Sequence, residues 1–144
     1  LSLTAVVVAT SLTACSGTGN DAPTRMITQV TDGVEANLAS EGNLIYLRNI
    51  QVAVNEAGDA SLVGTIVNQK NTKEALLALA INQMQIKLTA IPTPQNQPVI
   101  FGGPSANAIA TIPNSGLVAG NRTRVSFFFG LAGTVSVDAL VVHA

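Results

Sequence analysis

The stretch Arg124–Val141 reads RVSFFFGLAGTVSVDALV, and it decides the fold class more strongly than any other part of the chain. Alternate positions on both sides of the turn sequence Gly130–Gly133 are apolar: Val125, Phe127, Phe129, Val135, Val137, Ala139 and Val141. A period of two is that of a strand with one face in a core. Glycine on both sides of a short connection favours a hairpin. This stretch therefore predicts a β-hairpin whose Phe and Val face enters a core.

A second hairpin is predicted earlier in the chain. Residues 50–54 alternate between apolar and polar or small side chains, and Asn55–Asp59 is rich in turn-forming residues. Residues 62–67 then carry apolar side chains on both faces. That pattern is typical of a strand covered on both sides.

The segment Glu74–Ile81 is ambiguous because it is short and dominated by Ala and Leu. Local propensity favours a helix with Asn71 or Thr72 as its N-cap. A buried strand of similar length fits an apolar run this short equally well.

Shorter strands are predicted between these segments. Met84–Ala90 alternates, and Pro92, Pro94 and Pro98 then interrupt the pattern and predict a loop. Val99–Phe101 and Ala108–Ile112 are two further candidates. Roughly seven or eight short strands separated by Gly, Pro and Asn turns predict a single antiparallel β-sandwich.

The N-terminal region has a different character. An apolar run, Leu1–Leu12, leads into Leu12-Thr13-Ala14-Cys15, and small polar residues follow. The order resembles the lipobox of a bacterial lipoprotein, in which Cys15 would be lipidated and the chain cut before it. The run is shorter than the roughly 20 residues that span a bilayer, so it fits the apolar part of a signal peptide. An idle or buried thiol is the alternative for Cys15.

This pattern predicts three regions. Residues 1–14 are a signal peptide whose natural start lies upstream, because neither Met nor a basic segment precedes the apolar run. Residues 15–43 contain the lipidated Cys15, a flexible tether and a lead-in. Within the lead-in, a short strand or an irregular segment is expected between the turn sequences Asp32-Gly33 and Glu41-Gly42-Asn43. Residues 44–144 form the β-sandwich. The protein is expected on the extracytoplasmic face of the cell membrane, with the membrane as a partner through Cys15.

Charge and composition narrow the function classes. Seven Lys and Arg residues stand against eight Asp and Glu, and only 3% of residues are aromatic. No basic patch is evident for binding nucleic acid, and stacking platforms for bases are scarce. The single Cys excludes an internal disulfide.

Catalytic and metal-binding constellations are not evident. His143 is the sole His and lies next to the end of the given sequence. No internal His is therefore present to activate a Ser or Thr as a nucleophile. Met84 fits core packing and Met26 lies in the lead-in, which leaves no four-ligand set. We predict no catalytic residue, no metal site, no cofactor and no enzymatic activity.

Two charged pairs have ordinary explanations. Glu56 and Asp59 share a predicted turn, and calcium sites need about six to eight oxygen ligands. Arg122 and Arg124 lie on one strand face, which is typical of a solvated face or of edge-strand protection, although they could also meet an anionic headgroup.

Four stretches resemble actinobacterial lipoproteins of the LpqE type: DGVEAN at 32–37, IYLRNIQV at 45–52, GTIVN at 64–68 and VSFFFGLAGTVSV at 125–137. These lipoproteins are similar in turn to the periplasmic PCu(A)C copper chaperones, whose fold is a cupredoxin-like β-sandwich. The resemblance implies an all-β, immunoglobulin- or cupredoxin-like antiparallel sandwich. It also favours a strand for Glu74–Ile81.

The resemblance does not bring copper ligands with it. PCu(A)C proteins hold Cu(I) with His and Met side chains. The first family His would fall near Lys87–Thr89, and the later His and Met between Gly102 and Val118. Neither region contains His or Met.

Three functions are therefore considered. The first is a non-catalytic binding or accessory module that contacts an unknown protein or envelope component. The second is copper handling of PCu(A)C type with a degenerate or lost site. The third is carriage of a small apolar ligand between the two sheets, which requires an enclosed cavity.

Overall fold

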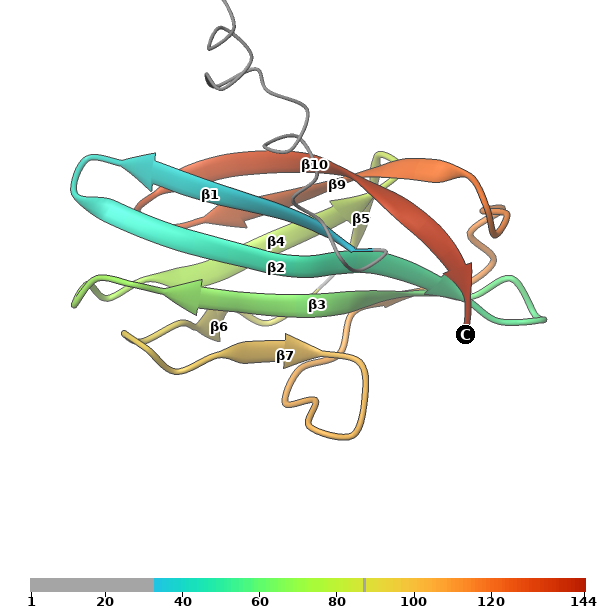
Figure 1. Ribbon diagram of the computed structural model, residues 1–144, viewed down its shortest axis with the longest axis horizontal. Helices are drawn as coiled ribbons and strands as arrows, with labels where there is room; N and C mark the ends of the chain where they lie inside the picture. Colours follow the sequence, from blue (N-terminus) through green and yellow to red (C-terminus); the bar gives the residue numbers. More distant parts are fainter. Residues whose placement is uncertain (1–32, 87) are drawn as a thin grey trace, which may run out of the picture. The chain divides into compact units, whose positions relative to one another are not determined.

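The computed structural model describes residues 33–86 and 88–144, which form ten strands and no helix (Figure 1). The strands are β1 Val34–Ser40, β2 Asn43–Val54, β3 Ala60–Asn68, β4 Ala75–Ile81, β5 Met84–Ile86, β6 Ile91–Pro92, β7 Val99–Phe101, β8 Thr111–Ile112, β9 Arg122–Phe129 and β10 Gly133–His143. The predicted all-β class is confirmed. Within these residues, no helix exists that is long and apolar enough to cross a membrane.

The strands form one curled sheet in the order β5-β4-β9-β10-β2-β3-β7, with β1 added to β2, β6 to β4 and β8 to β3. In Figure 1, β2 and β3 lie in front of β4 and β9, and β7 lies next to β3. The curled sheet is compatible with the expected cupredoxin-like sandwich. The sheet has two arms, β5-β4-β9 and β2-β3-β7, which meet at β10. β10 pairs with β9 along most of its length and with β2 at its C-terminal end.

The junction at β10 corrects one expectation, because the sheet is mixed and not purely antiparallel. Residues 140–143 of β10 run parallel to residues 51–54 of β2. β1 pairs antiparallel with the preceding part of β2, from Asn43 to Ile50. Alternation of side chains is the same in parallel and antiparallel strands, so the sequence pattern could not reveal this orientation.

Both predicted hairpins are present. In the β9–β10 hairpin, the register runs from Phe129 opposite Gly133 to Arg122 opposite Leu140. Val125, Phe127 and Phe129 are buried, as the alternation predicts. In the β2–β3 hairpin, Val54 pairs with Ala60 across the predicted turn.

The segment predicted either as helix or as strand is strand β4, so the helical alternative is wrong. β4 pairs with β9 on one side and with β5 and β6 on the other. Leu76, Leu79 and Ile81 are fully buried. Pairing on both edges and burial of these side chains outweigh the helical propensity of Ala and Leu.

Two predicted strands are shorter than expected. Within the alternating run Met84–Ala90, Met84–Ile86 forms β5, whereas residues 88–90 belong to no strand. The run Ala108–Ile112 is a strand only over β8, Thr111–Ile112, with an isolated bridge between Ala108 and Phe101. Alternation alone did not reveal where pairing stops.

β1 is the first strand among the described residues, and it alternates between half-buried and exposed residues. It lies between the turns predicted at Asp32-Gly33 and Glu41-Asn43. This part of the lead-in is therefore a short strand, one of the two alternatives that the sequence leaves open.

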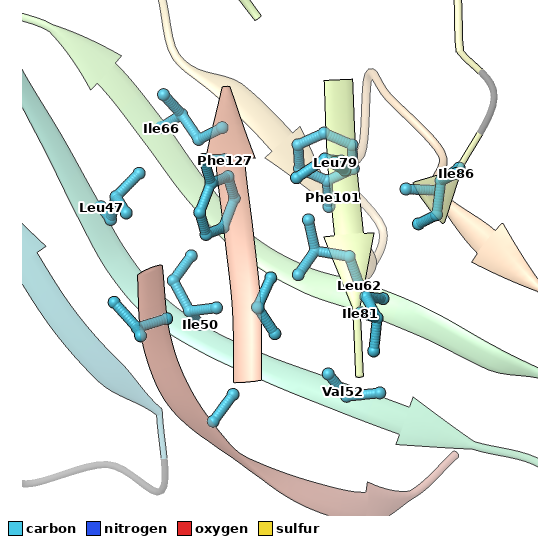
Figure 2. Packing of buried hydrophobic residues seen from close by; sticks show 14 of the residues in the cluster. Leu47, Ile50, Val52, Leu62, Ile66, Leu79, Ile81, Ile86, Phe101 and Phe127 are labelled. Atoms are coloured by element: carbon cyan, nitrogen blue, oxygen red, sulfur yellow. The ribbon is translucent and has the colours of Figure 1, made fainter. Parts of the chain in front are cut away.

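The core fills the space between the two arms of the sheet. Figure 2 shows side chains of β2 and β3, such as Leu47 and Ile66, pointing toward Phe127 of β9 and Leu79 of β4. Phe127 stacks on Phe129 with ring centroids 6.5 Å apart. The largest fully buried side chains come from both arms: Phe101, Phe127, Ile45, Leu47, Ile50, Leu62, Ile66, Leu76, Leu79, Ile81, Val52 and Val125.

Candidate functional site

The lipobox residues Leu12, Thr13, Ala14 and Cys15 lie outside the described residues, and so does Met26. Lipidation of Cys15 therefore stays a prediction.

The region where the resemblance places the first copper ligand borders a surface hollow with both apolar and polar side chains. It lies between the β4–β5 pair Leu79–Ile86 and the β4–β6 pair Leu76–Ile91. The hollow there has a volume of about 490 Å³ and is lined by Leu77, Ala78, Gln85, Ile86, Leu88 and Thr89. None of these side chains carries an imidazole or thioether group. Met84 of β5 is half-buried and packs against the core, as predicted.

The fold places His143 closer to the second ligand region than its position in the sequence indicates. His143 pairs with Val54, and both line a hollow of about 720 Å³ together with Leu117, Val118 and Ala119. Glu56 also lines this hollow. Met84, whose thioether is a possible copper ligand, does not line it. The sequence alone does not indicate this proximity, because it arises from the parallel β2–β10 pairing. Among the described residues, no group of three or more His, Cys, Asp and Glu side chains could hold a metal ion.

The predicted turn at Asn55–Asp59 uses its polar groups to hold the turn. The side-chain oxygen of Asn55 accepts the N–H of Asp59 at 2.9 Å. A carboxylate oxygen of Asp59 accepts the N–H of Asn114 at 3.1 Å. One local hydrogen bond and one hydrogen bond to the distant residue Asn114 therefore hold the turn, so Asp59 has a structural role.

The two arginines of β9 lie on an exposed face. β4 pairs with β9 only from Val125 to Phe129, so Arg122 and Arg124 lie where β9 extends beyond β4 and pairs with β10 alone. Arg124 approaches Asp138 at 3.9 Å, and Arg122 donates to the main-chain oxygen of Asp138 at 3.2 Å. Both features fit a solvated sheet face, where such ion pairs contribute little stability.

A buried carboxylate was not anticipated from the sequence. Glu74 is 3% exposed. Its Oε1 accepts the N–H groups of Ala75 at 2.9 Å and Leu131 at 2.8 Å, and its Oε2 accepts that of Ala132 at 2.8 Å. Glu74 thereby attaches the start of β4 to the β9–β10 turn.

Beside Glu74, two loops enclose a third surface hollow of about 550 Å³. It is lined by Asn71, Thr72, Lys73, Glu74, Pro92, Pro94 and Gln95. The sequence pattern of these two segments predicts only a helix cap and a proline loop. The signal that could have identified the site is the clustering of amide, hydroxyl and ammonium side chains in both segments.

Comparison with known proteins finds similarity at the level of the fold. No protein-family model matches the chain, and no curated protein matches it either. Solved structures do match. "Apo PCuAC domain from PmoF1" has a TM-score of 0.59 and 17% sequence identity, covering 76% of this chain and 100% of that one. "Copper-bound PCuAC domain from PmoF2" has a TM-score of 0.57 and 16% identity, covering 76% of this chain and 99% of that one. The chain therefore has a PCuAC-like fold.

Proposed function

We propose that this protein is a non-catalytic binding or accessory module, attached through lipidated Cys15 to the extracytoplasmic face of the cell membrane, and that it is a lipoprotein of the LpqE type. The motif Leu12–Cys15 ahead of a PCuAC-like β domain is the observation that carries the proposal. Residues Ser16–Thr24, which are mostly small and polar, would act as a tether between membrane and domain.

The anchor is tested by replacing Cys15 with Ser in full-length protein expressed in a bacterial host with its own upstream signal sequence. The parent protein should sediment with membranes and incorporate radiolabelled palmitate. The Cys15→Ser protein should be released and unlabelled, because one thiol carries the entire attachment. The variant Ser16→Ala, next to the lipidation position, is the matched control and should behave as the parent. Equal membrane retention of the Cys15→Ser protein would refute the anchor.

Copper handling is a second candidate, and one specific feature favours it. A copper-bound PCuAC domain shares the fold, and the β2–β10 pairing brings His143 beside residues 117–119. If the chain takes up Cu(I), His143 is the imidazole available to bind it, since the chain has one His. Uptake would then be lost in the variant His143→Ala.

Carriage of an apolar ligand between the sheets is not proposed. The space between the two arms is occupied by buried side chains such as Phe101 and Phe127. The hollows described above lie at the surface, where loops and strand ends line them.

A further inference from the structure

The hollow between residues 71–74 and 92–95 has the dimensions of a small-molecule site. Its volume of about 550 Å³ lies within the roughly 300–1,000 Å³ that is typical of ligand pockets. Pro92 and Pro94 are exposed and supply apolar wall, and Asn71, Thr72, Lys73 and Gln95 supply polar groups. Apolar walls with a few polar groups are the usual composition of such sites.

The two walls are joined by a buried hydrogen-bond network. Asn68, which is fully buried, donates through Nδ2 to the main-chain oxygen of Thr93 at 2.9 Å and to Thr72 Oγ1 at 3.2 Å. The N–H of Thr93 donates to the main-chain oxygen of Glu74 at 2.9 Å. Gln95 Nε2 donates to the main-chain oxygen of Gln69 at 3.1 Å. The network fixes the distance between residues 71–74 and residues 92–95. A ligand therefore does not have to pay the entropic cost of ordering these two segments.

The lip of the hollow offers hydrogen-bond donors that the fold does not use. The hydroxyl of Thr72 accepts from Asn68, so its own proton remains to be donated. Gln95 uses one N–H toward Gln69 and keeps the other. Both oxygens of Glu74 already accept main-chain N–H groups.

Lys73 adds a positive charge at this lip. Its side chain is exposed, and within residues 33–86 and 88–144 the two ion pairs are Arg48–Glu35 and Arg124–Asp138, so neither uses Lys73. An ammonium group with available N–H donors beside it is suited to an oxyanion, since charge-assisted hydrogen bonds are the strong ones.

From this arrangement we propose that the hollow binds a small organic anion whose carboxylate or phosphate group lies at Lys73 and Thr72, with its carbon skeleton against Pro92 and Pro94. The inference deepens the proposed binding function by assigning a site and a ligand class. It does not depend on the membrane anchor, so the two can fail separately.

The test is an NMR titration of the ¹⁵N-labelled full-length Cys15→Ser chain with glycerol 3-phosphate, glycerate and glycerol as probes. At least one anion should give saturable shifts of the amides of Thr72, Lys73 and Gln95, and glycerol should not. Shifts with only one anion would identify the head group. The variant Lys73→Met should weaken binding roughly tenfold, because it removes the charged donor and keeps the side chain's length.

Lys70→Met is the matched control, because Lys70 is exposed and does not line the hollow. This variant should bind as the parent does. The proposal is overturned if neither anion shifts these amides, if glycerol shifts them with the same affinity, if Lys73→Met binds like the parent, or if Lys70→Met loses as much affinity as Lys73→Met. Both variants change exposed side chains, so their folding should be unaffected.

Discussion

The carboxylate of Glu74 connects two segments that lie 57 residues apart in the sequence. Its acceptors satisfy three main-chain N–H groups at the start of β4 and in the β9–β10 turn. Buried donors left without an acceptor are costly, and hydrogen bonds to a charged group are stronger than neutral ones. Glu74 therefore stabilises the fold rather than acting on a ligand.

Replacing Glu74 with Ala should lower the free energy of unfolding by about 2–5 kcal/mol, since it removes the acceptor and leaves buried N–H groups unpaired. Urea denaturation followed by circular dichroism measures the change. The exposed Glu56 provides the control, and Glu56→Ala should stay within about 0.5 kcal/mol of the parent. A Glu74→Ala protein as stable as that control would contradict the structural role.

Gly64 is the second single residue on which the fold depends. Its φ is +147°, and a Cβ atom there would come within 2.5 Å of Ile50 Cδ1 and 3.1 Å of Ile50 Cα. Gly64→Ala should cost about 1–3 kcal/mol of stability through overpacking and backbone strain. Gly130→Ala is the matched control, because a Cβ there meets its nearest neighbour at an ordinary 3.5 Å. Thermal denaturation should show a clear loss for the first variant only, and equal melting temperatures would contradict the close approach.

At the scale of elements, β9 allows a direct comparison of its two faces. Phe127 is fully buried between the arms of the sheet, whereas its neighbour Phe128 is half-buried on the opposite face. Phe127→Ala should therefore lower stability by about 3–5 kcal/mol, and Phe128→Ala by clearly less. Chemical denaturation of both variants provides the measurement. The reverse order would place the wrong face of β9 in the core.

The elements also show which parts of the fold the sequence could predict. Both long hairpins were predictable because their alternation extends over enough residues and turn-forming residues separate the strands. β4 was not, because an Ala- and Leu-rich run has no period that distinguishes a strand from a helix. The parallel β2–β10 pairing was not predictable either, since orientation depends on distant chain segments.

The candidate sites were less predictable than the strands. In the sequence, Glu74 is only the first residue of an ambiguous segment. The main-chain N–H groups that it accepts from Leu131 and Ala132 lie far along the chain. The hollow beside it is built from two loops that come together through Asn68 and Thr93. His143 lies at the hollow lined by residues 117–119 because β10 pairs with β2. Sites assembled from distant segments leave little signal in the local pattern.

At the scale of the whole molecule, a PCuAC-like fold is combined with regions that lack the His and Met residues expected as copper ligands. The fold is shared with apo and copper-bound PCuAC domains. The regions where the resemblance places their His and Met ligands hold Leu88, Thr89 and a stretch free of both residue types. We therefore expect the β domain to bind a protein or envelope component at the membrane, and we expect it not to bind copper.

A competition titration with Cu(I) under reducing conditions tests this claim most directly. The full-length Cys15→Ser chain is used, so that a free thiol does not bind the ion, and His143→Ala in the same background is the comparison. When a chromophoric chelator of micromolar affinity competes for the ion, we predict that neither protein retains Cu(I). Retention of one Cu(I) per chain, lost in the His143→Ala protein, would contradict it and establish copper handling instead.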